Sequence, residues 1–186
     1  MRTRPEWLSR AKAQFFADVR EDPYLGYVLV GALVLAAFWF WHRIPVFATW
    51  DEHDRVLDPL VAYSSVLNNP GWEGLQEGIS WGREPWGGTF YLYALAVFPV
   101  VLGAAVTGNI DAITGIGLPD YTYAHYEVWA ETPRWVWTGS LVFVRLTNVL
   151  LAVGTVYLVY RLGTEIWTRR TGRLAALMLT VTFGFI

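Results

Sequence analysis

Hydrophobic residues in this chain are gathered into long uncharged runs, which polar and charged segments separate. The first run, residues 24–41, contains no charge and ends in the aromatic sequence FWFW. Two more cover residues 88–108, with Pro99 in the middle, and residues 135–160, with Arg145 as the single charge. A helix of about 20 apolar residues is long enough to cross the hydrocarbon core of a bilayer. The pattern therefore predicts an all-α membrane protein built as a multi-pass helical bundle.

The polar segments between these runs suggest how the chain is organised. The last apolar run has 13 residues, too few to cross a membrane, so we expect the sequence to be the N-terminal part of a longer protein. In chain order we expect a cytoplasmic amphipathic segment (1–22), a first transmembrane helix (23–42), an external part with juxtamembrane helices (43–134), a transmembrane helix (135–160), a basic cytoplasmic loop (161–173) and the start of a truncated transmembrane helix (174–186).

The N-terminal segment alternates basic and apolar residues. Its apolar residues recur at the spacing of one helix face, and they are Trp7, Leu8, Ala11, Phe15 and Val19. The segment also carries five basic residues, Arg2, Arg4, Arg10, Lys12 and Arg20, a composition typical of a helix that lies on a membrane surface. A solvated cytoplasmic tail is the alternative. Because no small-residue cleavage site follows the first apolar run, we interpret that run as an uncleaved signal anchor.

The run at 88–108 leaves two topologies open. If it crosses the membrane, the basic N-terminus and the basic segment 161–173 lie on opposite sides, against the rule that Lys/Arg-rich loops stay in the cytoplasm. If it instead enters and returns, or lies along the surface bent at Pro99, both basic segments are cytoplasmic. Residues 43–134 then form one external part. We favour the second topology because it agrees with the charge distribution.

Composition supports a membrane protein and narrows the function. The chain is 54% hydrophobic and only 16% charged, where soluble domains are about 25% charged. The net charge of -2, without a basic stripe, argues against a nucleic-acid partner. The absence of cysteine excludes disulfides and thiolate metal sites.

An acidic cluster, Asp51-Glu52-His53-Asp54, follows the first apolar run. One interpretation is purely structural: Thr49 and Glu52 fit the spacing of a capping box, in which both side chains satisfy free backbone N–H groups at a helix start. Asp58 followed by Pro59 resembles a second helix start. This interpretation predicts two short helices, at about 50–57 and 59–67.

The alternative interpretation of the cluster is chemical. Carboxylates are suitable ligands for Mg²⁺ or Mn²⁺, and a carboxylate can also remove a proton from an attacking hydroxyl group. Four consecutive residues cannot all point to one side of a helix, so a single metal ion held by all four is not expected. The local pattern leaves base and metal ligand both open.

The order of several motifs resembles the N-terminal part of the GT-C membrane glycosyltransferases, in particular the protein O-mannosyltransferase and aminoarabinose-transferase branch. A basic start and an anchor helix are followed by WDEHD, then by a Trp/Gly-rich part that ends in REPWGGTFYLY. Next come Arg145-Leu146 inside an apolar run and a basic segment from Arg161-Leu162 to Arg173. The resemblance extends over nearly the whole chain.

The resemblance implies an enzyme that transfers a sugar from a polyprenyl-phosphate-linked donor to a protein, lipid or glycan acceptor at the external face of the cell membrane. It implies Asp51 as catalytic base with Glu52 as helper, or both as ligands of a divalent cation. Arg145 would contact the donor phosphate, or else extend outward to the membrane surface. The remaining expected substrate-binding residues are Arg83, Glu84, Trp81 and Trp86.

Two other classes compete with this hypothesis. A non-catalytic multi-pass protein, such as an assembly or lipid-flipping partner, would use the acidic cluster only for helix capping. A transporter usually carries its charged residues at the middle of broken helices, whereas here they gather near the membrane surface. Stacking on a sugar would suit the rings of Trp72, Trp81 and Trp86. These residues equally fit an aromatic belt at the membrane interface. On its own, a fragment of this length is expected to be inactive.

Overall fold

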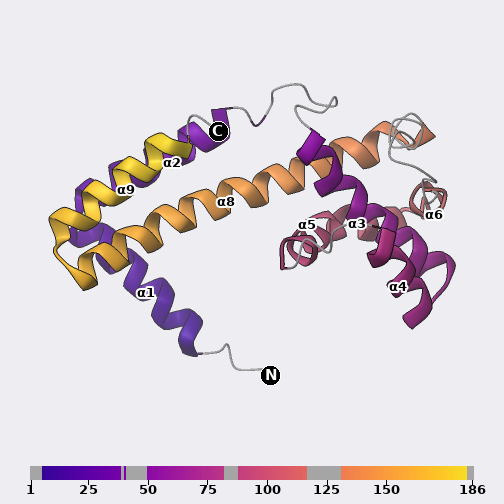
Figure 1. Ribbon diagram of the computed structural model, residues 1–186, viewed down its shortest axis with the longest axis horizontal. Coiled ribbons are helices and arrows are strands. Elements are labelled where there is room, and N and C mark those ends of the chain that lie inside the picture. Colours follow the sequence, from indigo (N-terminus) through magenta and orange to yellow (C-terminus); the bar gives the residue numbers. More distant parts are fainter. Residues whose placement is uncertain (1–5, 39, 41–49, 82–87, 117–130, 184–186) are drawn as a thin grey trace. The chain divides into compact units, whose positions relative to one another are not determined.

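The computed structural model describes residues 6–38, 40, 50–81, 88–116 and 131–183, without the side chains of residues 50–54 and 81. All the secondary structure in these residues is helical, as the sequence predicts (Figure 1). The helices are α1 (Glu6–Glu21), α2 (Pro23–Phe38), α3 (Trp50–Asn68), α4 (Trp72–Trp81), α5 (Gly88–Val106), α6 (Asp111–Thr114), α8 (Arg134–Ile166) and α9 (Arg169–Phe183).

Two of the described helices are long and apolar enough to cross a membrane. They are α5, with 19 residues, and α8, with 33 residues. A third candidate arises only if α1 and α2 are taken together, and these two helices meet at a bend of 109°. On its own, α2 has 16 residues and a length of about 24 Å, somewhat less than a hydrocarbon core of about 30 Å.

The chain forms two compact units. The terminal unit contains Met1–Trp39 and Asn148–Ile186, and the central unit contains Phe40–Thr147. Helix α8 contributes its first part to the central unit and its last part to the terminal unit.

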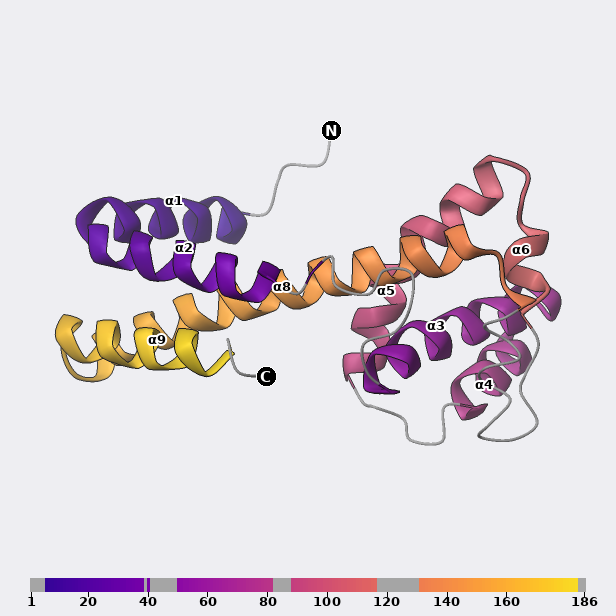
Figure 2. The ribbon, with the colours of Figure 1, turned by 90° about the horizontal axis from the view of Figure 1, so that it is seen from above.

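In the central unit, α3 lies between α4 and α5 and also contacts α6 (Figure 2). The core of this unit is formed by one apolar side of α3, by α5, by the start of α8, and by Ile113 and Ile116 in and just after α6. The close approach of α3 and α4 needs glycine, because a Cβ at Gly78 would lie 2.6 Å from Cα of Ala62. A Cβ at Gly139 would lie 3.1 Å from Cγ2 of Val100, so α5 and α8 also pack closely there. The side chain of Tyr63 donates a hydrogen bond of 2.9 Å to the carbonyl of Ala94 and so joins α3 to α5.

The structure corrects the prediction of two short helices at 50–57 and 59–67. Trp50–Asn68 is one continuous helix with Pro59 inside it. A proline in a helix interior costs about 3 kcal/mol, because it removes one backbone hydrogen bond and crowds the preceding turn. The helix continues because four apolar residues around the proline are fully buried, and burying each such side chain stabilises by about 1.5–3 kcal/mol. These residues are Val56, Leu57, Leu60 and Val61.

In the terminal unit, α2 packs along α9 (Figure 1) and the last part of α8 joins them. Its core consists of Leu25, Val28, Leu29, Ala32, Val156, Tyr160 and Ala176. The connection between α8 and α9 is shorter than the predicted loop 161–173, since only Trp167 and Thr168 separate the two helices. Their close approach needs Gly163 and Gly172: a Cβ at the first would lie 2.8 Å from Cα of the second.

Two further predictions compare directly with the helix boundaries. The predicted amphipathic segment 1–22 contains α1, and the predicted transmembrane helix 135–160 lies within α8. Helix α5 continues through Pro99 to Val106, so among the described residues the run is one unbroken helix. An unbroken helix of this length suits either a crossing or a helix along the surface, and the membrane topology stays a prediction.

Candidate functional site

The acidic cluster occupies the first turn of α3, which begins at Trp50. The following turns of α3 are held in place by the fully buried Val56 and Leu57. The core of the central unit therefore positions the backbone of Asp51 and Glu52. The first core residue of α3, Val56, follows them in the next turn. Their side chains are outside the described part of the structure, as is the predicted cap Thr49.

A divalent-cation site at Asp51 and Glu52 stays a prediction. Among the residues whose side chains are described, no three His, Asp or Glu groups lie close enough together to hold a metal ion. The side chains of the predicted ligands, in residues 50–54, are outside that description.

Asp58 is a second acidic residue of α3 and lies two turns after Asp51. The sequence interpretation assigned it to a helix cap, whereas the structure places it inside the helix and buries it to 7% exposure. Its spacing of seven residues from Asp51 puts both on one side of α3. This spacing was the signal in the sequence that could have marked Asp58 as more than a cap.

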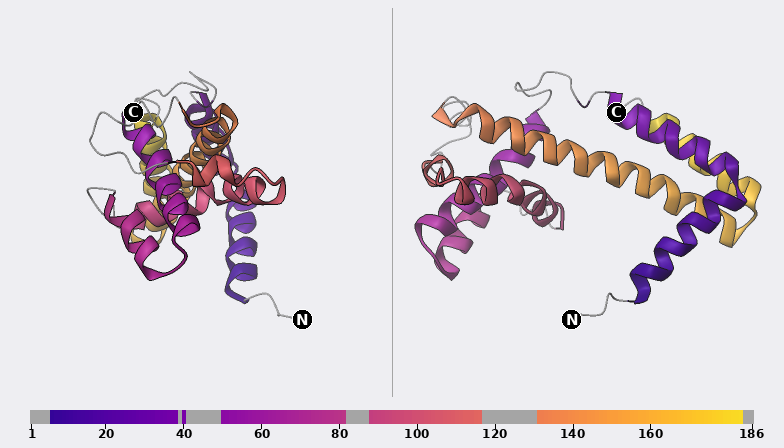
Figure 3. Two further views of the ribbon diagram at one scale, coloured as in Figure 1. Left: turned by 90° about the vertical axis from the view of Figure 1, so that its right-hand side faces the viewer. Right: turned by 180° about the vertical axis from the view of Figure 1, so that it is seen from behind.

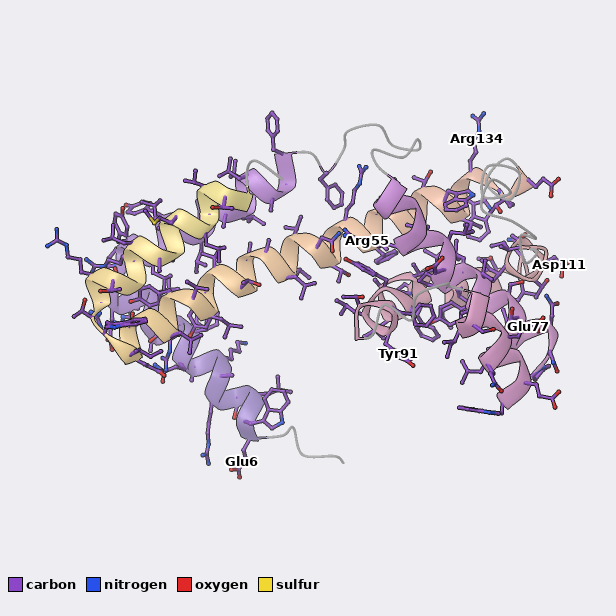
Figure 4. All side chains as sticks on the ribbon, viewed as in Figure 1. Glu6, Arg55, Glu77, Tyr91, Asp111 and Arg134 are labelled. Atoms are coloured by element: carbon purple, nitrogen blue, oxygen red, sulfur yellow. The ribbon has the colours of Figure 1, made fainter. Side chains whose placement is uncertain are left out.

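Arg55 lies between these two acids and points to α5. Its guanidinium group lies 5.6 Å from the ring centroid of Tyr93, a cation–π contact between α3 and α5. Arg55 is exposed, and Figure 4 shows it near the N-terminal end of α3. A cation is thus present one helical turn from the candidate catalytic residues.

Arg145, the single charge in its apolar run, is buried in the central unit with 7% of its surface exposed. One guanidinium nitrogen donates a hydrogen bond of 2.6 Å to the backbone carbonyl of Phe40. This contact holds the cation inside the central unit, which also contains the first turn of α3. Contact with the donor phosphate and extension toward the membrane surface both stay predictions.

The remaining predicted substrate-binding residues fall largely outside the description. Arg83, Glu84 and Trp86 lie in residues 82–87, which the structure does not describe. Trp81 is the last residue of α4, and its side chain is likewise outside the description. At the other end of α4, the side chain of Trp72 is exposed.

A polar cluster that the sequence analysis did not single out lies in the terminal unit, at the bend between α1 and α2. Asp22 is completely buried, and its carboxylate accepts hydrogen bonds from the Tyr160 hydroxyl at 2.8 Å and from Nε of Arg173 at 2.8 Å. It also accepts one from the backbone N–H of Tyr24 at 3.2 Å, which makes it the cap of α2 ahead of Pro23. The Asp-Pro pair was a signal for this cap.

Asp18 forms a similar group one helical turn earlier. Its carboxylate accepts hydrogen bonds from the Tyr157 hydroxyl at 2.7 Å, from Arg161 at 2.9 Å and from Gln14 at 2.9 Å. The ring of Tyr157 also packs edge-on against Phe15, with centroids 4.9 Å apart. These contacts fasten the last turns of α1 to α8.

Hydrogen bonding holds both carboxyl groups ionised. Burial of Asp18 and of Asp22 opposes ionisation, but the hydrogen bonds they accept outweigh burial. The dominant donors are Tyr157 for Asp18 and Arg173 for Asp22, and both pKa values fall below the ordinary value of 3.8. Arg161 neutralises Asp18 and Arg173 neutralises Asp22, so we interpret the cluster as a structural one that holds the helices of the terminal unit together.

Comparisons of the chain with protein-family models, with curated proteins and with solved structures find no match.

Proposed function

We propose that this chain is the N-terminal part of a multi-pass membrane glycosyltransferase, which uses a polyprenyl-phosphate-linked sugar donor at the external face of the cell membrane. The motif order described in the sequence analysis favours this activity. The structural observation that supports it is the position of the acidic turn. Asp51 and Glu52 begin a helix that packs against α5, which is apolar enough to cross or line a membrane.

The chemistry requires a base near a lipid-borne sugar. Asp51 acts as the base that removes the proton from the acceptor hydroxyl while that oxygen attacks the anomeric carbon of the sugar, and the lipid phosphate departs. Glu52 assists it, or both carboxylates hold Mg²⁺ or Mn²⁺. Arg145 supplies an inward positive charge for the phosphate, since a charge inside a membrane helix usually serves a ligand or a partner.

The test uses the full-length protein in membranes and measures transfer of labelled sugar from a polyprenyl-phosphate donor. We expect Asp51→Asn to lower transfer by about 100-fold or more, as loss of a general base does. Glu77→Gln is the matched control, because Glu77 is an exposed carboxylate on α4 in the same unit (Figure 4). Equal activity of Asp51→Asn and wild type would refute the catalytic role.

Two further measurements separate the remaining roles. Loss of transfer on addition of a chelator, restored by Mg²⁺ or Mn²⁺, would assign Asp51 and Glu52 to a metal ion. A higher KM for the donor in Arg145→Gln, with the protein still folded, would support the phosphate contact. Unchanged donor affinity would refute the phosphate contact.

A non-catalytic membrane protein is the second candidate, and the start of α3 at Trp50 favours it. Asp51 and Glu52 fall in the first turn, where backbone N–H groups lack helical partners and the helix dipole stabilises negative charge. In that case Asp51→Asn would reduce helix stability by about 0.3–1 kcal/mol, and wild-type protein would show no sugar transfer.

A further inference from the structure

The outer half of α1 exposes large apolar side chains. Trp7 is 66% exposed and Leu8 48%. Leu8 lies on the same side of the helix as Phe15 and Val19, which are seven and eleven residues further on. Those two pack against the core of the terminal unit. The apolar side of α1 therefore packs against the terminal unit at its C-terminal end. At its N-terminal end, among the described residues, the same side is exposed.

Basic residues accompany this apolar side. The first twelve residues contain four cations (Arg2, Arg4, Arg10 and Lys12) against one acid, Glu6, which gives a net charge of +3. The ammonium group of Lys12 lies 5.9 Å from the ring centroid of Phe16. Lysine at such a place keeps its stem on the apolar surface while the charge reaches the polar layer. Trp, Leu and Phe beside Lys and Arg are typical of helices that bind at an anionic membrane surface.

The bend at Asp22 sets the direction of α1. The two helices meet at 109° (Figure 3), which is 19° beyond a right angle. A membrane helix is tilted on average by about 20° from the bilayer normal. If α2 enters the membrane with such a tilt in the plane of the two helices, in the direction that offsets the 19°, α1 lies parallel to the bilayer surface. The buried Asp22 and the hydrogen-bonded Asp18 hold it there.

We propose that the outer half of α1 binds anionic phospholipid headgroups at the cytoplasmic surface of the membrane, with Trp7 and Leu8 inserted at the level of the headgroups. We assign lipid as the binding partner because this segment combines exposed apolar side chains with an excess of cations. Anionic leaflets attract such basic segments. This binding does not depend on sugar transfer, and it would hold for a protein of any activity with this terminal unit.

The test is made simple by the absence of cysteine from the chain. Leu8→Cys and Ala13→Cys are each labelled with the environment-sensitive dye NBD. Both positions are exposed, and they differ by five residues, or about 140° around the helix. The labelled 186-residue chains are reconstituted singly in nanodiscs of phosphatidylcholine alone or with phosphatidylglycerol. Emission wavelength and quenching by spin-labelled lipid are measured for each.

We expect the label at position 8 to emit at shorter wavelength and to be quenched by spin-labelled lipid in discs with phosphatidylglycerol. The label at position 13 should remain in water. The effect at position 8 should be weaker in phosphatidylcholine alone. In a chain that also carries Arg10→Gln and Lys12→Gln, the net charge of the first twelve residues falls from +3 to +1, and the difference between the two lipids should become smaller.

Three outcomes would overturn the proposal. Equal water exposure at positions 8 and 13 in anionic discs would make α1 a solvated tail. Equal shielding at position 8 in both lipids would remove the preference for anionic headgroups. Shielding at position 8 without quenching by labelled lipid would mean that protein, and not lipid, covers this side of α1.

Discussion

The hydroxyl group of Tyr160 donates a 2.8 Å hydrogen bond to the buried carboxylate of Asp22, which is 138 residues away in sequence. The same carboxylate receives Arg173 from α9 and caps α2. One side chain thus connects the start of α2 with the end of α8 and the start of α9.

Removing this carboxylate should loosen the terminal unit. We expect Asp22→Ala to lower the free energy of unfolding by about 1–3 kcal/mol, because the buried Tyr160 hydroxyl loses its acceptor and Arg173 its partner. Thermal unfolding in detergent measures the change. Glu21→Ala is the control: Glu21 pairs with Arg169 at 3.3 Å on the surface, and such exposed pairs contribute about 0–1 kcal/mol. An equal loss of unfolding free energy in both variants would contradict the role of Asp22 in holding the three helices together.

The two ionised carboxyl groups predict a loss of stability in acid. The pKa values of Asp18 and Asp22 in the folded chain lie below 3.8, their ordinary value. As the pH falls, the unfolded chain therefore binds protons before the folded chain does. The stabilisation by the two ionised carboxyl groups is complete above pH 3.8 and is lost as the pH falls through their pKa values in the folded chain.

We expect the Tm to decline below about pH 4, and to decline less in a chain with both Asp18→Asn and Asp22→Asn. Thermal unfolding of the two proteins across the acid range makes the comparison. Parallel curves for wild type and the double variant would show that other acids cause the decline.

The crossing of α8 and α9 should tolerate no side chain at Gly172. A Cβ there would lie 2.6 Å from the carbonyl oxygen of Tyr160, closer than real Cβ contacts come. We expect Gly172→Ala to lower the free energy of unfolding by about 1–3 kcal/mol through forced separation of the helices. Gly154→Ala is the matched control on α8, since nothing lies within 4 Å of its Cβ position. This control should be neutral or stabilising by up to about 1 kcal/mol, because alanine favours helix.

The favoured topology makes a prediction about accessibility in intact cells. If residues 43–134 are external and residues 161–173 cytoplasmic, a cysteine at Asp120 reacts with an impermeant maleimide, while one at Thr171 reacts only after permeabilisation. The reverse pattern of labelling would mean that α5 crosses the membrane. The 186 residues contain no native cysteine that would interfere with either measurement.

Helix positions were largely predictable because they depend on local sequence. The amphipathic start of the chain and the long apolar run around Arg145 both became helices close to the predicted residues. The interruption at Pro59 was predicted wrongly, since a proline preceded by an aspartate usually marks a helix start. Burial of Val56 and Leu60 on either side of it against α5 and α8 kept the helix continuous, and that packing is not visible in the local pattern.

The sequence by itself determined that the chain is helical and rich in membrane-length apolar segments, because helix period and apolar length are properties of neighbouring residues. It also marked Asp51 and Arg145 as candidates. Only the tertiary structure decided that Arg145 donates a hydrogen bond to the carbonyl of Phe40 and that Asp22 accepts one from Tyr160. Those contacts join residues more than 100 positions apart, and they form only because helix packing brings the two polar groups together away from water.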